Sequence, residues 1–211
     1  FVLYGAHSGG NSFLHPRDMD PRGPYAGKVV SSLMPLSGTQ EGGALMLIDA
    51  ANYSEQNTPA NAQVVGQGGQ VQWTEKEIDL GRGLSQFGRI TAPFPLWDGT
   101  NRVLLAYRPC EVTRNGVVVP CVTLTDAERA MLADDTMSRA QQALQPVQDN
   151  APAVYSIYMV DPAKQTLVAM FGSRLYQGVS YPFAGSFEFV PNAASAAVPR
   201  QVRQLHLRQQ A

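Results

Sequence analysis

The sequence has few charged residues, and this scarcity excludes several classes of partner. Only 16% of the 211 residues are charged, and 16 basic against 17 acidic side chains leave a formal net charge of -1. Such a balance provides no basic footprint for a phosphate backbone, so we expect no nucleic-acid partner. No apolar run approaches the roughly 20 residues that cross a bilayer, so we expect no membrane span in this chain. The 44% of hydrophobic residues is enough to build a globular core.

Signatures of common catalytic and cofactor sites are also missing. The sequence contains no Gly-x-Ser-x-Gly elbow, no His-Glu-x-x-His, no Walker loop and no Cys-x-x-Cys. We therefore expect no cofactor, and whether the protein is an enzyme stays open. The chain opens at Phe1, inside an apolar run, with neither an initiator Met nor a signal peptide. This beginning favours a piece of a longer precursor.

The sequence does contain a set of short strand-like runs, and one phrase of sequence, a pair of such runs, occurs twice. In each copy a basic residue opens an apolar run, and a second apolar run ends in Asp. Lys28 and Asp49 bound the first copy, and Arg102 and Asp161 bound the second. An Asx-type turn can follow each Asp. Two copies of a strand pair predict a repeat architecture.

The second copy is the more complete, with four consecutive runs that read as antiparallel strands at 90–96, 102–108, 155–161 and 166–171. Four such strands make one propeller blade, and central strands that are apolar on both faces suit blades packed face to face. The prediction is an all-β fold of antiparallel β-propeller blades, a partial propeller of about two blades with one small helical insertion. Its parts are a partial propeller over 1–190, blade-like repeats at about 28–50 and 89–171, a helical insertion at about 125–146, and a linker or tail at 191–211.

The only two cysteines lie in the insertion between the second and third strands of this blade. Cys110 and Cys121 are equidistant from Asn115-Gly116. A two-residue turn there places them opposite each other, where Cα atoms lie about 4.5 to 5.5 Å apart, within reach of a disulfide. Counting from the turn makes them a hydrogen-bonded pair, the wider and less favoured of the two sites for a bridge. Two free thiols are the alternative. A disulfide would imply an oxidising compartment, periplasmic or extracellular.

The rest of the insertion reads as a helix with a capping box, in which Thr125 is the N-cap and Glu128 is its partner at the third position. Residues 134–136 can break this helix into two pieces. Residues 52–69 are rich in Asn, Gln and Gly and are expected to form a long surface loop. The many aromatic residues, Trp73, Trp97 and Phe94 among them, are interpreted as core more than as binding platforms.

The most polar stretch that is not of low complexity covers residues 6–20. His7, His15 and Asp18 are its candidate metal ligands, because imidazoles and carboxylates on a loop can meet in a propeller channel. The eight-residue spacing of the histidines matches no standard zinc pattern. Arg17 also disfavours a cation and offers Asp18 or Asp20 a salt bridge, so a hydrogen-bonded loop is the stronger interpretation.

Three segments carry a family resemblance: a glycine-rich entry into a strand ending in Ile-Asp (42–49), the strand Ala-Pro-Phe-Pro-Leu (92–96), and Tyr-Ser-Ile-Tyr-Met-Val-Asp (155–161). In these the chain resembles TolB-type (PD40) β-propellers of exported bacterial proteins. More narrowly, it is similar to the middle propeller domain of hydrazine synthase alpha subunit-like proteins. Haem attachment requires Cys-x-x-Cys-His, which this chain lacks.

The resemblance implies a non-catalytic scaffold or protein-interaction module whose partners are the remaining propeller blades or other domains of a larger parent protein. The alternative is the propeller domain of a periplasmic redox or hydrolytic enzyme complex whose catalytic residues lie outside this chain. The full-length parent sequence would separate the two: a catalytic signature would favour the enzyme, and further blades alone would favour the scaffold.

Overall fold

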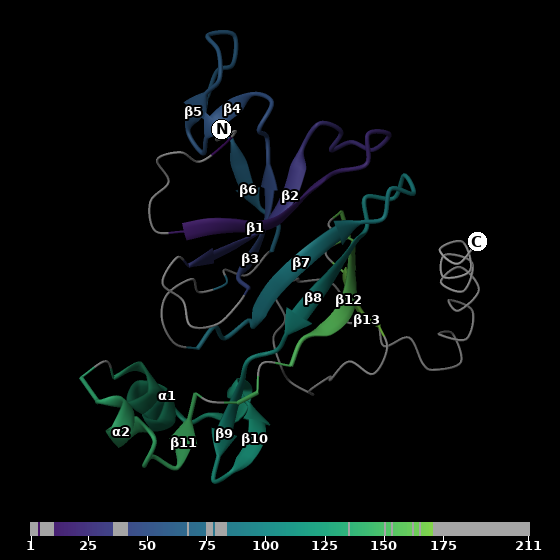
Figure 1. The fold of residues 1–211 in the computed structure, drawn as a ribbon. Coiled ribbons are helices and arrows are strands. Elements are labelled where there is room, and N and C mark those ends of the chain that lie inside the picture. The colour runs from purple at the N-terminus through teal and green to yellow at the C-terminus, as the bar shows by residue number, and fades with distance from the viewer. Residues whose placement is uncertain are drawn as a thin grey trace, which may run out of the picture.

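Two four-stranded antiparallel sheets form the body of the protein (Figure 1). In the described part of the chain helices are few and lie in one insertion, so the all-β prediction is confirmed at the level of fold class. A computed structural model describes residues 4, 11–35, 42–66, 68–74, 78, 84–134, 136–149, 151–152, 154–161, 163–164 and 166–170.

The first sheet contains four strands in chain order, interrupted by a small hairpin. Its strands are β1 (Asn11–Asp18), β2 (Val29–Pro35), β3 (Ala44–Ile48) and β6 (Gln70–Gln72), and the hairpin joins β4 (Tyr53–Glu55) to β5 (Thr58–Pro59). Two expectations were wrong here. The polar stretch 6–20 contributes strand β1, and the segment 52–69 contains a hairpin where only a loop was expected. The first copy of the repeat is therefore also four-stranded.

The second sheet has the four strands that the sequence predicted. They are β7 (Arg89–Pro95), β8 (Val103–Arg108), β12 (Ser156–Asp161) and β13 (Thr166–Ala169), arranged in the order β13-β12-β8-β7. Each sheet is thus an antiparallel meander with one insertion, after its third strand in the first sheet and after its second strand in the second. Four strands connected in this way have the topology of a propeller blade.

The first strand of each sheet carries the same irregularity. Pairing with the neighbouring strand shifts between Leu14 and Arg17 in β1, and between Thr91 and Phe94 in β7. In each case three steps along the first strand match two along its partner, which is a one-residue bulge. Within each bulge the residue before a proline has a positive φ, which is 53° for His15 and 49° for Ala92. Proline suits a bulge because it has no N–H to give to the ladder.

The Asp residues that end the repeated phrase begin turns, as the sequence predicted. The Oδ1 atom of Asp49 accepts the backbone N–H of Asn52 at 3.2 Å, and Oδ1 of Asp161 accepts that of Ala163 at 3.1 Å. In the first sheet Asp49 also pairs with Lys28, the basic residue that opens the phrase, at 3.1 Å. In the second sheet the opening basic residue, Arg102, pairs with Asp98 of the preceding turn at 2.6 Å.

One apolar core joins the two sheets. Strand β7 lies against β1, β2 and β3, and backbone hydrogen bonds of 2.8 and 2.9 Å link Gly43 and Ile90 in both directions. Alternation in the second sheet turns Tyr107 and Tyr158 into this core, where their rings meet edge to face with centroids 5.1 Å apart. The fully or nearly buried members of the core include Val30, Leu45, Leu47, Ile90, Val103, Leu105, Val160 and Leu167.

The insertion between β8 and β12 has a small core of its own, below the sheets in Figure 1. The predicted capping box is confirmed: Thr125 accepts the backbone N–H of Glu128, whose carboxylate accepts that of Thr125. The helix ends before a second capping box, Ser138 with Gln141, which starts another short helix. The insertion consists of β9 (Glu111–Arg114), β10 (Val117–Pro120), a 3-10 turn (Cys121–Thr123), α1 (Asp126–Ala133), α2 (Arg139–Gln142) and β11 (Val147–Gln148).

The described residues form two four-stranded sheets, the three-stranded sheet β10-β9-β11 and the hairpin β4-β5, with no closed ring among them, so the propeller itself stays a proposal. Three predictions fall outside the described residues: the strand at 1–5 apart from residue 4, the strand at 183–190, and the linker or tail at 191–211. None of the helices in the described part of the chain is long and apolar enough to cross a membrane.

Candidate functional site

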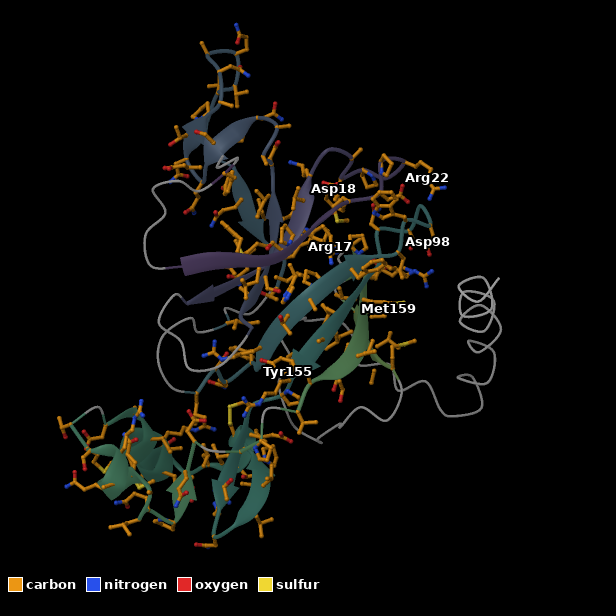
Figure 2. The ribbon with its side chains drawn as sticks, viewed as in Figure 1. Arg17, Asp18, Arg22, Asp98, Tyr155 and Met159 are labelled. Carbon is orange, nitrogen blue, oxygen red and sulfur yellow. A yellow bond between two sulfur atoms is a disulfide. The ribbon has the colours of Figure 1, made fainter. Side chains whose placement is uncertain are left out.

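The densest polar cluster lies where the loop after β1 meets the turn between β7 and β8. Asp20 is its centre and is 1% exposed. Its carboxylate accepts hydrogen bonds from the backbone N–H of Arg22 at 2.9 Å, from the Arg22 guanidinium at 3.1 Å for both Nε and Nη2, and from the backbone N–H of Gly99 at 2.7 Å. Asp20 therefore joins two segments that are far apart in the sequence. We call this cluster the sheet junction; Figure 2 labels Asp18, Arg22 and Asp98 around it.

Two further contacts tie the same turn to the end of β1 and to the loop that follows it. The indole Nε1 of Trp97 donates to the backbone carbonyl of Asp18 at 2.9 Å, and Nη2 of Arg22 donates to the carbonyl of Trp97. Within the turn, Asp98 accepts hydrogen bonds from Thr100 and Arg102. The Asp98 turn is thereby held as a rigid unit against the first sheet.

The carboxylates of the sheet junction stay ionised. Hydrogen bonds from Arg22 lower the pKa of Asp20 to about 2, and the hydrogen bond from the Thr100 hydroxyl is the largest cause of the lowering of the Asp98 pKa to about 2. A general base works best with a pKa near the operating pH. The pKa values of these two groups lie far below that range, and both carboxylates accept several hydrogen bonds, which suits a structural role.

The candidate metal ligands are not gathered into a site among the described residues. His15 lies at the bulge of β1 and is exposed, and its Nδ1 is 3.3 Å from the Oγ1 of Thr91 in β7. Asp18 ends the same strand, and His7 lies outside the described residues. In the part of the chain that the structure describes, no group of three or more His, Cys, Asp or Glu side chains could hold a metal ion. The metal hypothesis for His7, His15 and Asp18 stays a prediction.

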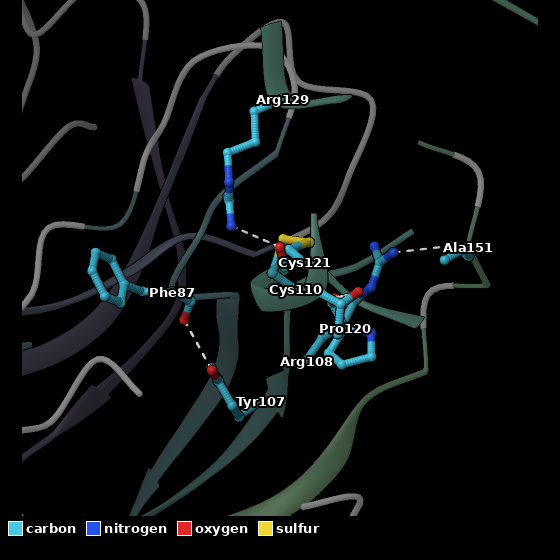
Figure 3. The surroundings of a disulfide bond; sticks show 9 residues. Phe87, Tyr107, Arg108, Cys110, Pro120, Cys121, Arg129 and Ala151 are labelled. Carbon is cyan, nitrogen blue, oxygen red and sulfur yellow. Dashed lines mark hydrogen bonds between the residues drawn. A yellow bond between two sulfur atoms is a disulfide. The ribbon is translucent and has the colours of Figure 1, made fainter. Parts of the chain in front are cut away.

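The two cysteines form the predicted disulfide (Figure 3). Their Cα atoms are 5.4 Å apart, and the backbone N–H of Cys121 donates to the carbonyl of Cys110 at 2.9 Å, as expected for a hydrogen-bonded pair. Both side chains are buried in the small core of the insertion. Arg129 of α1 donates to the carbonyl of Cys121 at 2.8 Å and so fastens the helix over the bridge. The disulfide is compatible with a periplasmic or extracellular protein.

A small pocket lies where the second sheet meets the insertion. Arg89 and Arg108, register partners at the ends of β7 and β8, are buried in its wall. Their guanidinium groups donate to the carbonyls of Gly42 at 3.2 Å and Ala151 at 3.0 Å. No sequence pattern marked this site, because Arg89 only opens one apolar run and Arg108 only closes another. The lining consists of Leu84, Ser85, Gly88, Arg89, Arg108, Pro109, Cys110, Glu111 and Asp149, with two acidic side chains against two basic ones.

The aromatic residues divide between core and surface. Trp73 is buried against Tyr25, with ring centroids 5.0 Å apart, as the core interpretation predicts. Phe94 and Trp97 are more than half exposed, at 57% and 52%. The core interpretation is therefore wrong for these two.

Comparison of the chain with protein-family models, with curated proteins and with solved structures found no match in any of the three. The likeness to TolB-type propellers therefore rests on the motifs quoted above.

Proposed function

We propose that the chain is a segment of a TolB-like β-propeller that acts as a non-catalytic scaffold or protein-interaction module of a larger exported protein. Its partners are the remaining blades or other domains of that protein. Two sheets cannot close a propeller, which needs about four blades or more.

One observation carries this proposal: both sheets are four-stranded meanders whose first strands carry the same bulge. The bulges at His15 and Ala92 share the register shift, the positive φ and the following proline. Bulges are design features of strands and not accidents of folding, so their repetition supports two copies of one structural unit. Repeated units of four antiparallel strands are the building principle of propellers.

The polar cluster at the sheet junction supports a scaffold role. The buried, ionised carboxylate of Asp20 accepts hydrogen bonds from Arg22 and from Gly99, which lie far apart in the sequence. It therefore holds these two segments together. Export is supported by the disulfide, since such bonds persist in oxidising compartments.

The test is the structure of the complete parent protein, by crystallography or electron cryo-microscopy. We expect a ring of blades in which β1 and β7 occupy equivalent positions. A β-sandwich made of these two sheets alone would contradict the proposal. Cross-linking in producing cells should join this segment to other blades or domains of the parent protein, and cross-links confined to the segment itself would contradict the interaction role.

The alternative, the propeller domain of a periplasmic redox or hydrolytic enzyme complex, stays a prediction. No arrangement among the described residues favours it over the scaffold.

A further inference from the structure

The second sheet has an apolar face that points away from the shared core. Strand register places seven side chains on it, contributed by all four strands: Phe94 beside Leu104, Met159 and Val168 in one row, and Thr91 beside Ala106 and Ile157 in the next. Thr91 is polar and buried, and the other six are apolar. We call these six residues the outer face; Met159 is labelled in Figure 2. Phe94 is 57% exposed and Ile157 is 50% exposed.

This face differs from the first sheet, whose central strand β3 is buried along its whole length. A sheet that is apolar on both faces is typical of a layer buried on both sides. A contiguous apolar surface on a soluble protein marks an interaction site. The outer face therefore requires an occupant.

The first sheet shows what kind of occupant fits. After its last strand, β6, the chain crosses residues 73–88 and returns as β7, which lies against β1, β2 and β3. Ile90, two residues before the bulge at Ala92, is fully buried by this packing, whereas Phe94, two residues after it, points outward. The strand that follows one sheet thus contributes to covering that sheet.

The sequence contains a third such proline at the corresponding place after the second sheet, and the residues around it match those around Pro93. Leu14-His15-Pro16 in β1 and Thr91-Ala92-Pro93 in β7 are followed, after β13, by Ser180-Tyr181-Pro182. In this alignment Val179 takes the place of Ile90, and Phe183 takes the place of Phe94. The match with β7 includes the two residues after the bulge, because Pro182-Phe183 repeats Pro93-Phe94.

We propose that residues 178–184 of the same chain dock on the outer face, as the first strand of the next blade. This inference rests on the proposed propeller and names the element that continues it. By analogy with Ile90, which faces the first sheet, we expect Val179 to face the second sheet and Phe183 to face the opposite side.

The connection is long enough. Residues 170–177 lie between β13 and the segment, and eight extended residues reach about 26–29 Å. A return from β13 to the level of β7 crosses three strand spacings of about 4.8 Å and one sheet spacing of about 10 Å, about 18 Å in all. The linker therefore reaches the face with length to spare.

The experiment is photo-crosslinking in the full chain with p-benzoylphenylalanine in place of Ile157, followed by tryptic digestion. We expect cross-links to the tryptic peptide 175–200, at a yield at least about ten-fold above that of a probe at Val117. Val117 is the matched control because it is an apolar side chain on a strand, 62% exposed, and it lies in the insertion. A probe at Phe94 repeats the measurement from a second position on the outer face.

Two further arms sharpen the result. When 15N-labelled and unlabelled chains are mixed, every cross-link should join two peptides that carry the same isotope, because both come from one chain. Val179→Asp should lower the yield at least about five-fold, whereas Phe183→Asp should leave it within about two-fold. Cross-links that join the two isotopes would show a second copy on the face, and a yield at the Val117 level would show that the segment does not dock. Either result overturns this inference, while the ring expected of the parent protein is tested separately by its own structure.

Discussion

Breaking the Cys110–Cys121 bond should loosen the insertion and leave the sheets folded. The bridged residues are 11 apart in the sequence. In the chain-entropy model a loop of this length lowers the entropy of the unfolded chain by about 9 cal/mol/K, which is about 2.8 kcal/mol at 25 °C. Because the bridge lies inside the small core of the insertion and not in the core of the sheets, the loss should be local.

Native-state hydrogen exchange measures this loss residue by residue. With the disulfide reduced, amides of β9 and β10 should lose protection by about 100-fold, the equivalent of about 2.8 kcal/mol. Amides of β8 and β12 are the internal control and should change less than about three-fold. A Cys110→Ala, Cys121→Ala variant should reproduce the pattern without a reductant. Unchanged protection of β9 and β10 would refute the reasoning, as would an equal loss in β8 and β12.

Two other perturbations test the packing of the sheets. Gly88→Ala should lower the free energy of unfolding by about 1–3 kcal/mol more than Gly116→Ala. Both glycines have φ near 80°, but a Cβ at Gly88 would lie 2.2 Å from the carbonyl oxygen of Arg108, whereas nothing lies within 4 Å of one at Gly116. Equal losses in urea unfolding would contradict this contact. The lowered pKa of Asp20 means that its contribution to stability is complete above its ordinary pKa of 3.8 and declines as the pH falls towards about 2. Asp20→Asn should therefore be less stable than the wild type at pH 6, with the difference shrinking between about pH 4 and pH 2; a difference independent of pH would exclude the carboxylate charge as its source.

Features set by neighbouring residues could be predicted from the sequence. The capping box of Thr125, the turns that begin at Asp49 and Asp161, and the opposed cysteines depend on contacts within about a dozen residues. The second sheet was equally accessible, because its strands are apolar runs bounded by turn residues. The register of the disulfide followed from counting outward from the Asn115-Gly116 turn.

Strand β1 escaped prediction because its apolar pattern is broken where its bulge lies. His15-Pro16-Arg17 reads as a polar loop, yet a bulge tolerates a proline and exposed polar side chains on an otherwise paired strand. Strand β6 does read as a strand in the sequence, although it is only three residues long. Its place in the sheet is set by pairing with β3, which no local signal conveys.

The sheet junction could not be predicted for a different reason. Asp20 and Gly99 are 79 positions apart, and their hydrogen bond exists only because the two sheets pack together. The sequence suggested a salt bridge from Arg17 to Asp18 or Asp20, whereas the ion pair that Asp20 forms is with Arg22. It could not indicate that the backbone N–H of Gly99, in the second repeat, would donate a hydrogen bond to the same carboxylate.

The insertion leaves and re-enters the second sheet at neighbouring points, since Tyr107 near the end of β8 pairs directly with Ser156 at the start of β12. A chain that departs and returns one strand spacing away could be closed by a short reverse turn. The insertion, with its disulfide, its helices and its small core, is therefore a cassette, a separate structural unit that the pairing of β8 with β12 does not require. Such a cassette can be lengthened, exchanged or removed during evolution with little effect on the blade that carries it.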